Sequence, residues 1–299
     1  MPRKIRILIG ALLASCHTAF AQTPPSEPAA KTTESVIVTA AGSSKEQIEK
    51  FVQQYAAASS RIDRLARWEN VICPVTLGLP SDQNQAVSTR IREVAAMVGA
   101  GESPKGKCSP RIIVIFTAQP QDLMDAIKRD YPRLLGRHYY SQTERVSRMA
   151  HPAQAWYGTA TQDTSGYVAS DTDRHGEPAE GQTFSSTGLI GFDGLSSRFQ
   201  SILIVVDLND AAGHQLAALS DYVAMLALSQ TQASDACQPL SSITNLLSKN
   251  CNPSDKSGSI TDMDIAYLKA LYSISPTSSF HSQKSRISTQ IEQSLGQQQ

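Results

Sequence analysis

Apolar residues recur along this chain with two different spacings, and the changes between them predict alternating helices and strands. Residues 44–67 carry apolar side chains every three or four positions, which predicts an amphipathic helix. Residues 67–79 then alternate between apolar and polar side chains, as a strand does, until Pro80 breaks the pattern. Residues 82–98 return to the helical spacing, and Gly99 ends that helix.

The rest of the chain continues this alternation, with a less regular middle. Between residues 138 and 197, aromatic strand-like pieces such as 151–162 are separated by polar stretches rich in Gly, Asp and Ser. The run RIIVIFTA, residues 111–118, is continuous and apolar, which is typical of a buried strand. The other predicted elements are a strand at 198–208 and helices at 121–130, 212–232 and 261–272.

This order of elements predicts a single α+β domain at residues 44–275, with a mixed sheet and helices packed against it. About 230 residues can bury a sizeable core without dividing into two domains. Residues 22–43 begin with a polar, Pro/Ala-rich stretch, so we expect a disordered lead-in there. Residues 276–299 are a Ser/Gln-rich polar tail, which we expect to be a loosely held helix or disordered.

Residues 1–21 have the three parts of a secretory signal peptide. A positively charged start is followed by a short apolar run and by Ala19-Phe20-Ala21, an A-x-A cleavage site. The stretch Leu13-Ala14-Ser15-Cys16 also resembles the lipobox of bacterial lipoproteins. Two outcomes therefore stay open: cleavage after Ala21, or acylation of Cys16. We expect a periplasmic or secreted protein, with a membrane-anchored lipoprotein as the alternative.

The charge balance argues against nucleic acid as a partner. The chain has 27 basic and 27 acidic side chains, and loss of the three basic residues in the signal peptide leaves 24 against 27. The mature chain is therefore slightly acidic, and its sequence suggests no dense basic cluster. Because affinity for nucleic acid comes largely from neutralised phosphates, a chain of this kind is a poor candidate for that role.

The mature chain keeps an even number of cysteines, which favours disulfides in an exported protein. Three pairings are possible among Cys73, Cys108, Cys237 and Cys251. Cys237 and Cys251 enclose a short loop and are paired first, which leaves Cys73 to pair with Cys108. A four-cysteine zinc site is the rival interpretation, but no C-x-x-C pair supports it.

Residues 220–230, SDYVAMLALSQ, have the frame of a zinc-peptidase helix without its chemistry. The pattern H-E-x-x-H-x-x-G-x-x-H places two histidines on one helical face, with a glutamate as general base. In this frame the ligand positions hold Ser220, Ala224 and Gln230, and Asp221 stands at the position of the base. None of the three can replace a histidine ligand, so we predict neither a metal site nor a cofactor here. The apolar and small side chains of the helix instead predict a buried core element.

The stretch ITDMDIAYLKALY, residues 260–272, is similar to the final helix of matrixin-type zinc peptidases, and Thr261 with Asp264 can also cap an ordinary helix. Together with RWENVICPVTLGL, RIREVAAMVGA, PRIIVIFTA, HPAQAWY and ALSDYVAMLALSQ, it resembles an uncharacterised family of secreted proteobacterial proteins. The resemblance covers most of residues 60–275. It implies a zincin-like, metzincin-related architecture without the metal site, and no assigned activity.

Other candidate chemistry in the sequence is sparse. His138, His151 and His175 are the histidines that could supply metal ligands from outside the helix at 220–230. Neither G-x-S-x-G nor a P-loop nor a dinucleotide-binding glycine motif occurs. Four aromatic residues could line a groove for a peptide or glycan, although core packing is the ordinary alternative. They are Tyr139, Tyr140, Trp156 and Tyr157.

The sequence therefore predicts a non-catalytic binding or scaffold protein with a degenerate metallopeptidase-like fold. Its partner would be a peptide, held along an exposed strand edge, or an envelope protein. The alternatives are a metal-dependent hydrolase or peptidase with ligands outside residues 220–230, and an envelope lipoprotein. Contact with a membrane is expected only in the last case, through an acylated Cys16.

Overall fold

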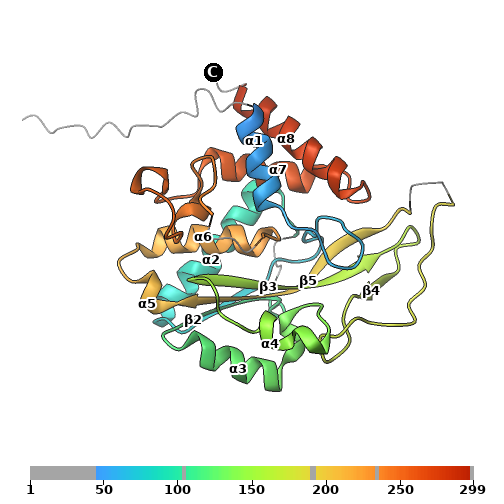
Figure 1. Ribbon diagram of the computed structural model, residues 1–299, viewed down its shortest axis with the longest axis horizontal. Coiled ribbons are helices and arrows are strands. Elements are labelled where there is room, and N and C mark those ends of the chain that lie inside the picture. Colours follow the sequence, from blue (N-terminus) through green and yellow to red (C-terminus); the bar gives the residue numbers. More distant parts are fainter. Residues whose placement is uncertain (1–44, 103–105, 189–192, 233–235, 297–299) are drawn as a thin grey trace, which may run out of the picture. The chain divides into compact units, whose positions relative to one another are not determined.

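The computed structural model describes residues 45–102, 106–188, 193–232 and 236–296. Within this part of the chain, a five-stranded mixed sheet carries helices on both faces (Figure 1). The predicted α+β class with one mixed sheet is confirmed. The signal peptide, Cys16 and the lead-in at 22–43 lie outside the described residues.

The sheet has the order β1-β2-β5-β3-β4. β1, β2 and β5 are parallel, and β3 runs antiparallel between β5 and β4. Parallel neighbours need a crossover, and a helix supplies it between β1 and β2. The strands are β1 Pro74–Leu77, β2 Ile112–Thr117, β3 Ala153–Gln162, β4 Val168–Ser170 and β5 Ser196–Asp207.

The larger helical layer covers one face of the sheet and forms the main core with it (Figure 1). It contains α1 Lys45–Tyr55, α2 Ser81–Val98, α6 Leu216–Leu228, α7 Asp262–Ser273 and α8 Phe280–Gly296. The opposite face packs against α3 Pro120–Asp130 and the segment that leads to α4 Thr143–Val146. The short helix α5, Leu208–Ala211, follows β5 directly.

β5 shows how the sequence divides its side chains between these two cores. Ile202, Ile204 and Val206 belong to the main core, whereas Leu203 and Val205 belong to the core beneath α3. Successive side chains of a strand point to opposite faces, so a strand covered on both sides has no polar positions to alternate with. This is why residues 202–206, in the middle of the strand, form a continuous apolar run.

Most of the predicted elements are present, but the strand predicted at 67–79 is confined to Pro74–Leu77 and the first helix is much shorter than predicted. The helix predicted at 44–67 ends at Tyr55, because Ala56 pairs with Thr231 in an isolated antiparallel bridge. Asp63 then adopts a left-handed backbone with φ of 52°, which a helix does not allow. Leu65 is buried all the same, but it reaches the core from an extended segment. The helical spacing beyond Tyr55 was therefore coincidental.

The C-terminal tail is part of the folded domain. Residues 280–296 form α8, and its Ile287 and Ile291 are fully buried in the main core. Gln283 is buried as well, and its side-chain oxygen accepts a hydrogen bond from Leu65 N at 2.8 Å. The polar composition of this tail describes its exposed face, whereas two isoleucines at helical spacing hold the other face against α1 and α7.

Both predicted disulfides are present, as Cys73–Cys108 and Cys237–Cys251. The first joins the residue before β1 to the chain just before β2, and the second closes a loop of the helical layer. Paired cysteines indicate an oxidising, extracytoplasmic environment. Among the described residues, none of the helices combines the length and the apolar character that crossing a membrane requires.

Candidate functional site

Asp221, which the predicted zinc-peptidase frame would place at the position of the base, is a structural clamp. Arg90 Nε of α2 donates to its Oδ1 at 2.5 Å, and Ile260 N donates to its Oδ2 at 2.9 Å. The carboxylate is nearly inaccessible, whereas Arg90 is about one third exposed. Both oxygens are thus engaged in joining α2, α6 and the start of α7. A group held in this way is not positioned to take a proton from a water molecule.

The three positions that correspond to metal ligands do not converge on a point. Ser220 Oγ donates to Leu216 O, one turn earlier in its own helix, at 2.7 Å. Ala224 is completely buried in the main core. Gln230 lies beyond the helix, where its Nε2 donates to Ala58 O at 3.2 Å. Within the described residues, no group of three or more His, Cys, Asp or Glu side chains is arranged to hold a metal ion.

The C-terminal end of α6 is closed by a collar of side-chain donors. The last carbonyls of a helix have no partner inside the helix, and burying them unpaired is costly. Here four consecutive carbonyls, those of residues 225–228, each accept a hydrogen bond from a side chain. The donors are Ser229 Oγ to Met225 O at 2.9 Å, Tyr157 OH to Leu226 O at 3.2 Å, Trp68 Nε1 to Ala227 O at 2.8 Å and Tyr272 OH to Leu228 O at 2.8 Å.

The two tyrosine hydroxyls of this collar keep the protons that they donate. Burial raises the pKa of Tyr157 and of Tyr272 well above the usual tyrosine range. The phenol groups therefore stay neutral at neutral pH and keep the protons that they donate. The aromatic side chains at the end of α6 are structural donors.

A different feature offers a binding position: the outer edge of β3. β3 pairs with β5 along its whole length, but β4 pairs only with Ala160–Gln162. Asp207 N donates to Pro152 O at 2.8 Å, so this pair is a hydrogen-bonded one. In an antiparallel ladder such pairs alternate, and Ala153 and Ala155 therefore direct their N–H and C=O groups away from β5.

The outward backbone groups of Ala153 and Ala155 border a cleft, where Ala153 is 5% exposed and Ala155 is partly exposed, and the edge is closed further along. At Tyr157 the chain around Gly136 lies against the edge, so closely that a Cβ on Gly136 would be 2.3 Å from Tyr157 O. No hydrogen bond reaches the outward backbone groups of Ala153 or Ala155 from any described residue. The sequence predicted the strand, but a free edge depends on the order of strands in the sheet, which its periodicity does not contain.

A narrow cleft with a volume of about 70 Å³ lies beside this free edge. Tyr222 and Leu226 of α6 line this cleft, together with Gln238 and Leu247 of the disulfide loop. Gln238 is 9% exposed, and its side-chain Oε1 has no hydrogen-bond partner among the described residues. A buried acceptor without a donor is unfavourable, so a bound N–H group would stabilise it.

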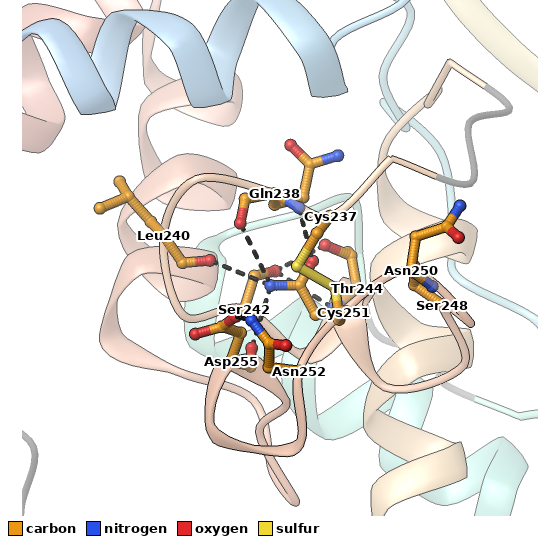
Figure 2. The surroundings of a disulfide bond; sticks show 11 residues. Cys237, Gln238, Leu240, Ser242, Thr244, Ser248, Asn250, Cys251, Asn252 and Asp255 are labelled. Carbon is orange, nitrogen blue, oxygen red and sulfur yellow. Dashed lines mark hydrogen bonds between the residues drawn. A yellow bond between two sulfur atoms is a disulfide. The ribbon is translucent and has the colours of Figure 1, made fainter.

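The wall of the cleft is held rigidly by the loop between Cys237 and Cys251, shown in Figure 2. Asn245 accepts from Gln238 N at 2.8 Å and donates to Leu240 O and Asp255 O at 3.2 and 3.0 Å. The amide of Asn245 thus replaces regular secondary structure inside the loop, and the disulfide closes its two ends.

Asp264 anchors this loop to α7. The carboxylate accepts from Ser242 Oγ at 2.5 Å and from Ile243 N at 2.9 Å, both in the loop. It also accepts from Thr261 in a capping box that begins α7, as the sequence predicts. Burial raises the pKa of Asp264, although its hydrogen bonds oppose that shift. The carboxylate therefore connects the wall of the cleft to the core of the domain.

The four aromatic residues proposed for a groove lie in three different places. Trp156 is buried in the core beneath α3, where its Nε1 donates to Val146 O. Its neighbour Tyr157 points to the other face of β3 and belongs to the collar of α6. Tyr139 and Tyr140 are exposed on the segment before α4. None of the four lines the cleft beside β3.

The three histidines are also separated. His138 is buried, with its Nδ1 2.9 Å from Gly136 O. His175 lies on a nearby loop, and its Nε2 accepts from Arg174 Nε at 3.0 Å. His151 instead lines the cleft beside β3. They do not form a joint ligand set in the part of the chain that the structure describes.

Comparisons of this chain with models of protein families, with curated proteins and with solved structures give no match. The zincin-like resemblance therefore stays a prediction. The features that bear on function are the free end of β3, the cleft beside it and the hydrogen-bonded side chains of α6.

Proposed function

We propose that this protein is a non-catalytic binding protein that holds an extended peptide along the free edge of β3. The observation that supports this most directly is the pair of outward-facing backbone positions, Ala153 and Ala155, beside a cleft with an unpaired acceptor on Gln238. A strand added at a sheet edge gains main-chain hydrogen bonds, and the neighbouring cleft selects alternate side chains. In this proposal the free edge of β3 supplies the main-chain hydrogen bonds, and the cleft supplies the contacts with alternate side chains.

The hydrogen bonds of Asp221 support a binding role for this protein over a hydrolytic one. Its two oxygens bind Arg90 and Ile260 N, so it serves the packing of three helices. The zincin-like resemblance fits the same proposal, since α6 follows β5 and contributes to the cleft beside the free end of β3, where a peptidase would bind its substrate. In our proposal the binding edge persists, and the helix beneath it has become a packing element.

The substitution Ala155→Pro tests the edge directly. Proline removes the outward N–H of Ala155, while the hydrogen bonds to β5 come from the neighbouring residues and stay intact. We expect peptides selected from a displayed library of unstructured sequences to bind this variant about tenfold more weakly, equivalent to about 1.4 kcal/mol. Fluorescence anisotropy with labelled peptides measures the change.

The matched control is Ala155→Ser, which keeps the N–H at the same position. We expect this variant to bind the selected peptides within about twofold of the wild type. Equal affinity of the proline variant and the wild type would contradict the proposal. So would a library from which the folded protein selects no peptide.

The finer location that we propose is periplasmic or secreted, with cleavage after Ala21. The two disulfides support an oxidising compartment, and the A-x-A site supports the position of cleavage. Intact-mass measurement of the exported protein is expected to give a chain that starts at Gln22. An acylated chain that starts at Cys16 would instead favour the lipoprotein alternative.

A further inference from the structure

The face of the sheet opposite α6 is covered by α3 and α4 (Figure 1). Exposed arginines and tyrosines lie on these helices and on the segment between them, and together they form a candidate patch. Lys128 Nζ of α3 contacts Glu144 Oε1 of α4 at 3.0 Å, so the two helices meet there. We call this patch the basic tyrosine face and define it by its exposed side chains: Arg129, Tyr131, Tyr139, Tyr140, Arg145 and Arg148.

The charge of this face is opposite to that of the mature chain. Residues 120–148, from the start of α3, contain six Lys and Arg side chains against four acids, Asp122, Asp125, Asp130 and Glu144. A count over the whole chain hides this local excess. Glu144 and Asp130 pair with Lys128 and Arg129, whereas Arg145 and Arg148 have no ion pair among the described residues. Both arginines are exposed and free to meet an anionic partner.

The tyrosines add an amphipathic component to the positive charge. Tyr131, Tyr139 and Tyr140 are 64%, 55% and 83% exposed, and they are among the most exposed large apolar side chains of the described residues. A tyrosine combines an apolar ring with a polar tip, which suits the boundary between lipid headgroups and acyl chains. The guanidinium of Arg137 lies 5.9 Å from the ring centre of Tyr139, so charge and ring are close together.

The shape of this face suits a broad partner. The main clefts found in the described residues are lined by other residues, so these tyrosines do not enclose a small molecule. An anionic bilayer offers many phosphate groups in one plane, and each Lys or Arg near such a surface strengthens binding. A basic face with exposed tyrosines therefore fits a lipid surface better than a single bound ligand.

We propose that the basic tyrosine face docks this protein on anionic phospholipid surfaces. The arginines approach the headgroup phosphates, and the tyrosine rings enter the headgroup layer. The face lies on the α3 side of the sheet, so docking leaves the cleft beside α6 open. This contact needs no acyl chain on Cys16 and is independent of peptide binding at β3.

Co-sedimentation of the full chain, purified after export, with lipid vesicles tests the proposal. We expect binding to mixed phosphatidylcholine–phosphatidylglycerol vesicles, which falls with added salt, and little binding to pure phosphatidylcholine. The double variant Arg145→Gln/Arg148→Gln is expected to bind anionic vesicles about 25-fold more weakly. Each arginine would then account for about fivefold, the equivalent of about 1 kcal/mol.

The matched control removes two exposed lysines from the other face of the sheet, as Lys50→Gln/Lys269→Gln. It changes the net charge equally but is expected to leave vesicle binding within about twofold of the wild type. A second variant, Tyr139→Ser/Tyr140→Ser, keeps every charge and is expected to lose the part of the binding that survives high salt. All these side chains are exposed, so circular dichroism should show unchanged folds.

Three results would overturn the proposal. The first is equal binding of the wild type to neutral and anionic vesicles, and the second is equal loss in both arginine and lysine variants. The third is retention on an anionic polysaccharide column without binding to vesicles, which would assign the face to a glycan.

Discussion

Asp264→Ala is expected to lower the free energy of unfolding by about 3–5 kcal/mol, because the buried carboxylate accepts four hydrogen bonds. Alanine leaves the buried N–H groups of Ile243 and Thr261 without a partner and removes one acceptor from the hydroxyl of Ser242. It also cuts the connection between α7 and the disulfide loop that lines the cleft beside β3. Chemical denaturation followed by circular dichroism measures the loss.

The pH dependence of this effect has a definite sign. Burial raises the pKa of Asp264 above its ordinary value of 3.8, so the folded protein holds this proton more tightly than the unfolded chain does. Its contribution to stability is complete below pH 3.8 and declines as the pH rises through the raised pKa. The alanine variant should lack this decline.

Asp262→Ala is the matched control, since Asp262 lies in the same first turn of α7 but is exposed. Its removal should cost no more than about 1 kcal/mol, through the charge at the helix N-terminus. If both variants lost the same free energy of unfolding, Asp264 would contribute only through its negative charge at the helix N-terminus, and its role as an anchor would be refuted.

The second large effect is expected at Asp221. Asp221→Ala leaves the partly buried Arg90 with only Glu93 as a partner and leaves Ile260 N unpaired, so we expect the free energy of unfolding to fall by about 3 kcal/mol. The exposed partner of Arg90 on the same helix, Glu93, provides the control. Glu93→Ala should cost less than about 0.5 kcal/mol, because a surface ion pair is weak.

A double variant separates the clamp from any catalytic role. Replacing both Arg90 and Asp221 by leucine removes the ion pair without leaving one charge alone, and much of the lost stability should return. Thermal midpoints of the wild type, the single variants and the double variant give this comparison. If Asp221→Ala were as stable as Glu93→Ala, the clamp would be refuted and a free carboxylate in α6 would have to be considered again.

The sequence predicts well what depends on neighbouring residues. The two faces of α2, its end at Gly99 and the capping box at Thr261 all follow from local spacing and local hydrogen bonding. The disulfide between Cys237 and Cys251 follows from a short loop in an exported chain. The burial of α6 follows from the lack of any charged side chain in it except Asp221.

The candidate site was beyond this kind of reasoning because its parts are far apart in the sequence. Arg90 and Asp221 are separated by 131 residues, and nothing in either segment identifies the other. The free edge at Ala153 and Ala155 exists because β4 is short and pairs only with the far end of β3. Both Tyr140 and Trp156 are aromatic residues next to another aromatic residue in the sequence. Only the packing shows that Tyr140 is exposed and Trp156 is buried.

The collar at the end of α6 has a consequence for how this chain folds. Its donors Tyr157, Trp68 and Tyr272 are 69, 159 and 44 residues from the carbonyls that they reach. Contacts of such long sequence separation form slowly, because the chain between them must first be ordered. The last turn of α6 can therefore be completed only after β3, the segment around Trp68 and the end of α7 have folded against it. Completion of this turn therefore requires all three of these parts to be folded. In an incompletely folded chain the last turn of α6 would unwind and become accessible to proteases.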